Sequence, residues 1–122
     1  AVVIACPFWD LSVPSMVRNY LERLCVTGLT FHYNEYGQTV ADCGLKRFVY
    51  VTTRGGYVDN TNPVLTDHAS AYLRSICAML SGARFDTLAA QGLDIIGNDV
   101  EALLQQAEAE ADRLAQSFWD EV

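Results

Sequence analysis

The sequence predicts an α/β domain built on a parallel sheet. Three apolar segments, at residues 2–6, 47–52 and 85–93, have the composition of strands, and an amphipathic segment follows each of them. This β-α-β-α-β-α order is typical of parallel strands joined by right-handed crossovers, with helices packed on the sheet. With 51% hydrophobic and 19% charged residues, the 122-residue chain has the composition of a folded domain. We therefore expect a single domain over residues 1–122.

Residues 2–28 predict a strand followed by a helix. Residues 2–6 form a continuous apolar run rich in β-branched side chains, which favours a strand buried on both faces. Pro14 is suited to the first turn of a helix, and apolar residues recur with helical spacing over 17–25. Gly28 is expected to end this helix because glycine tolerates the left-handed conformation common there.

The middle of the chain predicts a surface excursion, a second strand and a second helix. Residues 29–46 are partly apolar and then polar with many turn residues, so we interpret them as a long surface excursion. The run RFVYVT at 47–52 has the pattern of a second buried strand, and a loop follows it. Thr66 or Asp67 can cap the second helix, and Gly82 lies just past its end.

The last third predicts a weaker strand at 85–93, a turn at 94–99 and a final helix capped by Asn98 or Asp99. An apolar stripe along residues 103–118 gives this helix one face that can pack on the sheet. Four acidic residues of the helix are expected to face water: Glu101, Glu108, Glu110 and Asp112.

Three strands and three helices are too few to cover a parallel sheet on both faces. The sequence also begins inside a strand pattern, at Ala1. We therefore expect a doubly wound parallel sheet that lacks its first strands and helices, with one edge and part of one face bare. Either a preceding half of the domain or a partner molecule covers that surface.

Charge and composition exclude several kinds of partner. The net charge is −7, with eight Lys and Arg residues scattered along the chain, which argues against nucleic acid and anionic membranes as partners. No apolar stretch reaches the roughly 20 residues that span a bilayer. The cysteines form no CxxC pair, and His32 and His68 lack metal-ligand spacing, so we predict free thiols, no metal and a cytoplasmic protein. The cysteines are Cys6, Cys25, Cys43 and Cys77.

Two segments at the carboxyl ends of successive strands are the candidate site. Ligands of open α/β sheets bind at that edge. The apolar side chains of one segment can lie against a planar ring. The glycine pair of the other segment lets the polar edge of such a ring approach the backbone closely. A plain turn explains the glycine pair equally well, and the aromatic pair could instead pack under a loop or at an oligomer interface. The candidate residues are Pro7, Phe8, Trp9, Asp10 and Leu11 after the first strand and Thr53, Arg54, Gly55 and Gly56 after the second.

Longer stretches of sequence resemble one enzyme family. PFWDLSVPSMVRNYLERLCVTGLTFHY resembles a segment of FMN-dependent NADH:quinone oxidoreductases and azoreductases. TTRGG resembles the T-S-R-G-G of that family, and AAQGLDIIGND resembles a later stretch, so the resemblance spans essentially all of the chain. It implies a flavodoxin-like fold with strand order 2-1-3-4-5, and a homodimer with FMN at the subunit interface.

The resemblance also implies an activity and a set of contacts. The enzyme would pass electrons from NAD(P)H to quinones or azo compounds by a ping-pong mechanism. Residues 7–11 would lie against the isoalloxazine ring and residues 53–56 would hold its polar edge, while Phe31 and Tyr57 would bind substrate. No catalytic side chain is required, because the flavin itself carries the redox chemistry.

The chain departs from the family pattern at three points. Asp10 replaces an asparagine, and a carboxylate cannot donate the hydrogen bond that an amide gives. Val58 stands where the family often has histidine, and the serine-rich phosphate loop of the family is not in this sequence. These departures leave a second hypothesis: a truncated or degenerate flavodoxin-like module that dimerises without flavin or activity. An electron-carrier flavodoxin is a third and less favoured interpretation.

Overall fold

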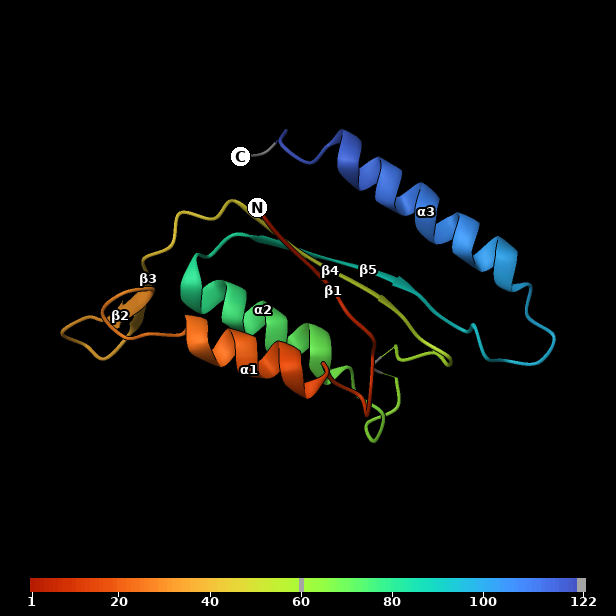
Figure 1. Ribbon diagram of the computed structural model, residues 1–122, viewed down its shortest axis with the longest axis horizontal. Coiled ribbons are helices and arrows are strands. Elements are labelled where there is room, and N and C mark those ends of the chain that lie inside the picture. Colours follow the sequence, from red (N-terminus) through yellow and green to blue (C-terminus); the bar gives the residue numbers. More distant parts are fainter. Residues whose placement is uncertain (60, 121–122) are drawn as a thin grey trace.

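A three-stranded parallel sheet forms the middle layer of the computed structural model, which describes residues 1–59 and 61–120. Helices α1 and α2 lie on one face of the sheet and α3 lies on the other (Figure 1). The strands stand in the order β1-β4-β5, which confirms the predicted α/β fold with a parallel sheet. The bounds are β1 Val2–Ala5, α1 Ser15–Leu24, β2 Phe31–Tyr33, β3 Thr39–Ala41, β4 Arg47–Thr53, α2 His68–Leu80, β5 Arg84–Ala90 and α3 Val100–Gln116.

The register of the sheet brings three loops to one edge. Val2 pairs with Phe48 at the start of the β1–β4 ladder, and Thr53 pairs with Ala90 at the end of the β4–β5 ladder. The three strands run in the same direction, so the segments that follow β1, β4 and β5 leave the sheet together. We call this carboxyl edge, with its loops at residues 6–14, 54–67 and 91–99, the rim.

The core lies between the sheet and the α1/α2 layer. Phe48 and Tyr50 of β4 are buried there against Leu21 of α1 and Leu73 of α2. Burying each such side chain contributes about 1.5–3 kcal/mol relative to leaving it exposed. This packing holds α1 and α2 in place and, through them, the loops that enter both helices at the rim.

The opposite face of the sheet is only partly covered. The side chains of β1 alternate between half-buried and exposed, and Val3 is 61% exposed, so the prediction that this strand is buried on both faces was wrong. The reason is that α3 packs mainly along β5, and no residue of α3 is fully buried. The predicted bare edge and bare part of one face are therefore present in this chain.

The predicted surface excursion contains a small antiparallel hairpin. Strands β2 and β3 pair from Phe31–Ala41 to Tyr33–Thr39, and Phe31 is 6% exposed. Asn34 forms the turn, since its side-chain oxygen accepts hydrogen bonds at 2.9 Å from the N–H groups of Tyr36 and Gln38. The sequence pattern missed the hairpin because each strand has three residues, too few for alternation to show.

Helix starts were predicted better than helix ends. Asp67 and Asp99 cap α2 and α3 as expected, each accepting a hydrogen bond from a backbone N–H in the first turn. Helix α1 ends at Leu24, well before Gly28, because the Thr30 hydroxyl donates to the Leu24 carbonyl at 2.6 Å. Strand β5 likewise ends at Ala90, short of the predicted Leu93.

A buried arginine fastens the end of α3 to the sheet. Arg47, at the start of β4, is fully buried and donates to the Ser117 carbonyl at 3.2 Å. Its guanidinium carbon also lies 5.5 Å from the centre of the Phe118 ring. A cation at the carboxyl end of a helix is favoured by the helix dipole. Arg47 therefore compensates in part for the absence of fully buried residues on α3.

Replacing Arg47 by methionine is expected to loosen α3 more than it destabilises the fold. Methionine fills much of the same volume without a buried charge. Asp86 loses its ion pair with Arg47 at 3.9 Å but keeps its contact with Arg84 at 3.3 Å. Because Asp86 keeps one cation, we expect a cost of about 1 kcal/mol, below the roughly 3–5 kcal/mol of a buried charge left without any partner. We expect faster amide hydrogen exchange in the last turn of α3, with an urea midpoint close to that of the parent. The control is Arg113→Met, in the last turn of α3; equal exchange in both variants would contradict this role for Arg47.

Candidate functional site

A tight turn presents the aromatic pair after β1. The backbones of Trp9 and Ser12 exchange hydrogen bonds of 3.1 and 3.0 Å, with Asp10 and Leu11 between them. Both central residues have positive φ angles, 51° and 67°, as in a type I′ turn. Such angles are uncommon for leucine and cost on the order of 1–2 kcal/mol. The Leu11 carbonyl accepts a hydrogen bond from the His68 N–H at 2.9 Å, which fixes the turn against the start of α2.

The turn sends the two aromatic side chains in different directions. Phe8 is partly buried against the core, whereas Trp9 is 59% exposed. Trp9 and Asp10 border a hollow of about 410 Å³ that extends to Pro14 and Arg18 at the start of α1. Trp9 is therefore the aromatic side chain of this pair that offers an open surface to a ligand.

Arg54 points into the protein and joins the rim loops. It is 5% exposed, and its guanidinium lies 4.5 Å from the centre of the Phe8 ring. One terminal nitrogen donates to the Gln91 side-chain oxygen at 3.2 Å and to the Val58 carbonyl at 3.4 Å. The other terminal nitrogen donates to the carboxylate of Asp67. Arg54 therefore connects the loops after all three strands with the start of α2.

Asp67 balances the charge of Arg54. Burial by itself raises the pKa of this carboxyl, but hydrogen bonds from Ser70 and the charge of Arg54 outweigh that effect. The net result is a pKa below the ordinary value for aspartate. Asp67 thus stays ionised at neutral pH and holds the guanidinium inside the protein.

The glycine pair uses its carbonyls within the rim and leaves its N–H groups open. The Gly55 carbonyl accepts from the Asp94 N–H at 3.0 Å, and the Gly56 carbonyl accepts from the Gly92 N–H at 3.1 Å. Within residues 1–59 and 61–120, neither glycine N–H has a hydrogen-bond partner. A methyl group on Gly55 would overlap the carboxylate of Asp94, so this close approach requires glycine.

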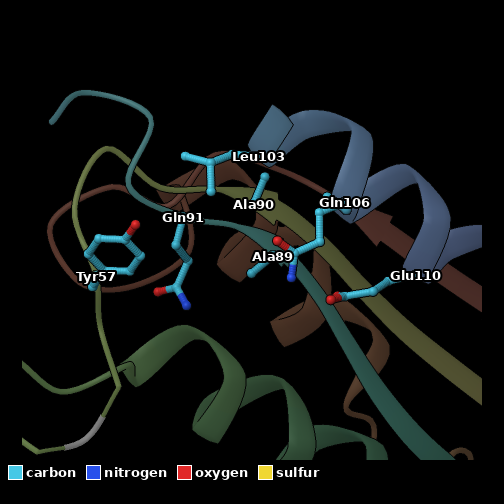
Figure 2. A pocket seen from close by; sticks show the side chains of 8 residues that line it. Tyr57, Ala89, Ala90, Gln91, Leu103, Gln106 and Glu110 are labelled. Carbon is cyan, nitrogen blue, oxygen red and sulfur yellow. The ribbon is translucent and has the colours of Figure 1, made fainter. Parts of the chain in front are cut away.

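Tyr57 borders a second hollow, of about 410 Å³, between the rim and α3. Figure 2 shows Tyr57 and Gln91 on one side of it and Gln106 and Glu110 of α3 on the other. The Asn98 amide donates to the Tyr57 hydroxyl at 3.2 Å and to the Gly92 carbonyl at 2.9 Å, which holds the tyrosine in place. Glu110 was predicted to face water, but it is half-buried and lines this hollow.

The structure brings together every predicted site residue except Phe31. Residues 7–11 and 54–57 lie on the rim, after β1 and β4, and Thr53 is the last residue of β4, directly before it. Phe31 belongs to the hairpin at the opposite end of the molecule, near the end of α2 (Figure 1). The Cys43 N–H, just after β3, donates to the Leu80 carbonyl at 2.9 Å and keeps the hairpin there. Phe31 therefore does not approach the rim of its own chain.

The third strand also contributes to the rim, which was not predicted from the sequence. That strand also ends at the carboxyl edge, so the rule that located the other two segments applies to it equally. The side chains of the rim that were not predicted hold its loops in position and do not face outward. Hydrogen bonds between segments that are distant in the chain leave no local pattern in the sequence. These side chains are Asp67, Gln91, Asp94 and Asn98.

Other sequence candidates carry no chemistry at the rim. All four thiols are free, as predicted, and burial raises the pKa of the Cys6 thiol, which disfavours a nucleophilic role. His32 is exposed and pairs with Asp42 at 2.8 Å. Among the described residues, no group of three or more acidic, histidine or cysteine side chains could hold a metal. No helix in the described part of the chain has the length and hydrophobicity to cross a membrane.

Comparison with known proteins gives consistent matches for this chain. The model of the flavodoxin-like fold family matches residues 1–115. FMN-dependent NADH:quinone oxidoreductase 2 of Clostridium acetobutylicum is 38% identical over 116 residues, which cover 95% of this chain and 58% of the relative. FMN-dependent NADH:quinone oxidoreductase of Caldicellulosiruptor saccharolyticus is 35% identical over 118 residues, covering 95% and 57%.

Solved structures show the same fold. An azoreductase from Bacillus anthracis superposes with a TM-score of 0.81 at 23% identity, covering 94% of this chain and 56% of the azoreductase. An FMN-dependent NADH-azoreductase from the same species, solved in complex with FMN, gives a TM-score of 0.79 over 97% of this chain. This chain spans a little more than half the length of the relatives that it matches. On the match over residues 1–115, the chain belongs to the flavodoxin-like fold family.

Proposed function

We propose that the rim holds the isoalloxazine ring of FMN and that the protein passes electrons from NAD(P)H to quinones or azo compounds. The observation that carries this proposal is the exposed Trp9 on the same edge as the open N–H groups of Gly55 and Gly56. The relatives named as FMN-dependent NADH:quinone oxidoreductases support it.

The rim suits the ring of FMN better than its phosphate. The indole of Trp9 offers an apolar surface for stacking, and the two glycine N–H groups can donate to the carbonyls and nitrogens of the ring's polar edge. The rim cation Arg54 is already paired with Asp67 inside the protein. The residues of the rim therefore fit a planar, uncharged group with acceptors along one side.

Bound FMN would supply the redox chemistry, accepting a hydride and passing electrons on. In this proposal Trp9 excludes water from part of the ring and the glycine amides orient its polar edge. Arg54, Gln91 and Asp67 hold the loops that carry those groups. The open rim can admit one substrate after the other, which favours a ping-pong mechanism.

We further propose a cytoplasmic homodimer. The bare side of the sheet around Val3 and the exposed residues of α3 give a surface for association. Since Phe31 lies far from the rim of its own chain, a role in substrate binding requires that it serve the rim of the second subunit (Figure 1). Tyr57, which borders the rim directly, is the second predicted substrate contact.

The alternative is a flavodoxin-like module that dimerises without FMN. Asp10 favours it, because a carboxylate on the rim cannot donate to a ring acceptor. The two functions are separated by following NADH oxidation with a quinone acceptor, with and without added FMN, and by sedimentation velocity. FMN-dependent turnover with parallel double-reciprocal lines supports the enzyme. A dimer with no FMN-dependent turnover supports the inert module.

Replacing Asp10 by asparagine is expected to tighten FMN binding. Asparagine tolerates the positive φ of this position and adds an N–H donor beside Trp9. One additional hydrogen bond is worth about 1 kcal/mol, or roughly a fivefold lower dissociation constant. Flavin fluorescence quenching measures it, with Asp59→Asn on the neighbouring loop as a control for loss of one negative charge. Equal tightening in both variants would show that charge, and not hydrogen bonding, is responsible.

A further inference from the structure

The hollow between the rim and α3 has polar groups on two opposite sides and apolar side chains between them. Tyr57 and Gln91 approach it from the rim, and Gln106 and Glu110 approach it from α3 (Figure 2). Its apolar lining residues are Ala89, Ala90, Leu103 and Ala107. An apolar lining with a few convergent polar groups is the usual form of a small-molecule site, and the volume of about 410 Å³ is large enough for an aromatic ring.

The rim side of this hollow offers hydrogen-bond donors. The Gln91 side-chain oxygen accepts from the Val58 N–H at 2.9 Å and from Arg54 at 3.2 Å. Because both partners are donors, this atom must be the oxygen, and the amide nitrogen of Gln91 keeps its two N–H groups for another acceptor. Within residues 1–59 and 61–120 that nitrogen has no partner. The Tyr57 hydroxyl accepts from Asn98 at 3.2 Å, so its own proton can also be donated.

The α3 side offers a carboxylate that lacks a cation. Glu110 is half-buried, and in the described part of the chain it forms neither a hydrogen bond nor an ion pair. Arg113 follows it in the last turn of α3 but makes no ion pair with it. Arg54 does not line the hollow, and its charge is balanced by Asp67. An occupant with a positive charge would therefore supply the cation that Glu110 lacks.

We propose that this hollow binds planar aryl cations, with a protonated amidine against Glu110 and the aromatic ring over the apolar side chains. An amidinium group can donate two parallel N–H bonds to one carboxylate, which is a strong form of charge-assisted hydrogen bond. An acceptor atom at the opposite end of the ring would meet the donors of Gln91 and Tyr57. The binding requires no flavin. That an electron acceptor carries the amidine or an alkylamine is a consequence that rests on the proposed function.

The first test compares benzamidine with benzamide, its uncharged analogue of nearly the same shape. Each is titrated into the full chain without flavin, and the side-chain amide signals of Gln91 and Gln106 are followed by nuclear magnetic resonance. We expect benzamidine to shift both signals and to bind about fivefold more tightly than benzamide, as a partly exposed ion pair allows. Equal affinities, or benzamidine that leaves both signals unchanged, would overturn the proposal.

Two matched variants locate the cation. Glu110→Gln keeps a good helix former in α3 and is expected to weaken benzamidine binding about fivefold without changing the binding of benzamide. Glu108→Gln is the control, because it makes the same change on the same helix at an exposed residue that borders a separate, apolar hollow. It should leave the affinity for benzamidine unchanged. If the two variants weaken benzamidine equally, the carboxylate of Glu110 does not hold the cation and the proposal fails.

The donors on the rim side are tested with 4-amidinobenzamide, which carries a carbonyl at the far end of the ring. It should bind more tightly than benzamidine. Tyr57→Phe removes one hydroxyl donor and is expected to weaken 4-amidinobenzamide about fivefold, with little effect on benzamidine. An equal loss for both ligands would contradict the assignment of Tyr57 as a donor to the occupant.

These titrations separate the inference from the proposed function. Charge-selective binding of benzamidine without FMN-dependent turnover would support the cation site and reject the proposed function. FMN-dependent turnover without benzamidine binding would leave the proposed function in place and overturn this inference.

Discussion

Replacing Arg54 by methionine is expected to destabilise the protein by about 3 kcal/mol at pH 7, because it leaves the carboxylate of Asp67, whose side chain is only 10% exposed, without its cation. The same change removes the hydrogen bonds from the Arg54 guanidinium to Gln91 and to the Val58 carbonyl, which weakens the attachment of the loop after β4 to the residues after β5. Urea unfolding followed by far-ultraviolet circular dichroism measures the cost. Asp67→Asn combined with Arg54→Met should recover part of it, because asparagine still caps α2 and carries no charge.

The cost of Arg54→Met is expected to depend on pH. In the folded protein the pKa of Asp67 lies below its ordinary value, so its stabilising effect is complete above the ordinary pKa. That effect is lost as the pH falls below about 4, toward the folded-state value. The difference in stability between parent and variant should therefore shrink in acid. A difference that stays constant from pH 7 to pH 3 would show that the ion pair does not carry the effect.

Replacing Gly92 by alanine is expected to have the second large effect. Gly92 has a φ angle of +75°, which costs an alanine on the order of 1–2 kcal/mol. The added methyl group would also overlap the Tyr57 ring and the Asn98 amide, and would push Tyr57 out of the rim. We expect about 2–3 kcal/mol of destabilisation in total, since strain and overlap add. Urea unfolding measures the stability, and flavin fluorescence measures FMN binding.

Gly97→Ala is a matched control for this prediction. Gly97 has a φ angle of +92°, but a methyl group there would meet no atom within 4 Å. It should therefore cost backbone strain alone and leave FMN binding nearly unchanged. If the two variants lose stability equally and bind FMN alike, then the contact of Gly92 with Tyr57 has no role at the rim.

The layered architecture could be predicted because local patterns encode it. The β-branched runs of β1 and β4, the helical spacing in α2 and the capping residues Asp67 and Asp99 act over a few neighbouring positions. Burial on the second face of β1 could not be predicted, because it depends on what packs there. The hairpin of β2 and β3 was missed because its strands are too short for a period to show.

The sequence predicted the position of the candidate site but not the direction of all its side chains. The rule for carboxyl ends of parallel strands located Trp9 and the glycine pair on one edge. It could not tell that Arg54 turns inward, because the partners that hold it, Asp67 and Gln91, are distant in sequence. Side-chain direction at a strand end is decided by such contacts and not by the residue's own position.

The most direct test of the ring site is a titration of FMN against the Trp119→Phe protein, in which Trp9 is the only tryptophan. Stacking of the ring against Trp9 predicts that flavin fluorescence and tryptophan fluorescence are both quenched, with the same dissociation constant. Flavin that stays fluorescent at high protein concentration would contradict the proposal that this chain binds FMN. Flavin that is quenched while Trp9 emission does not change would place the ring elsewhere on the protein.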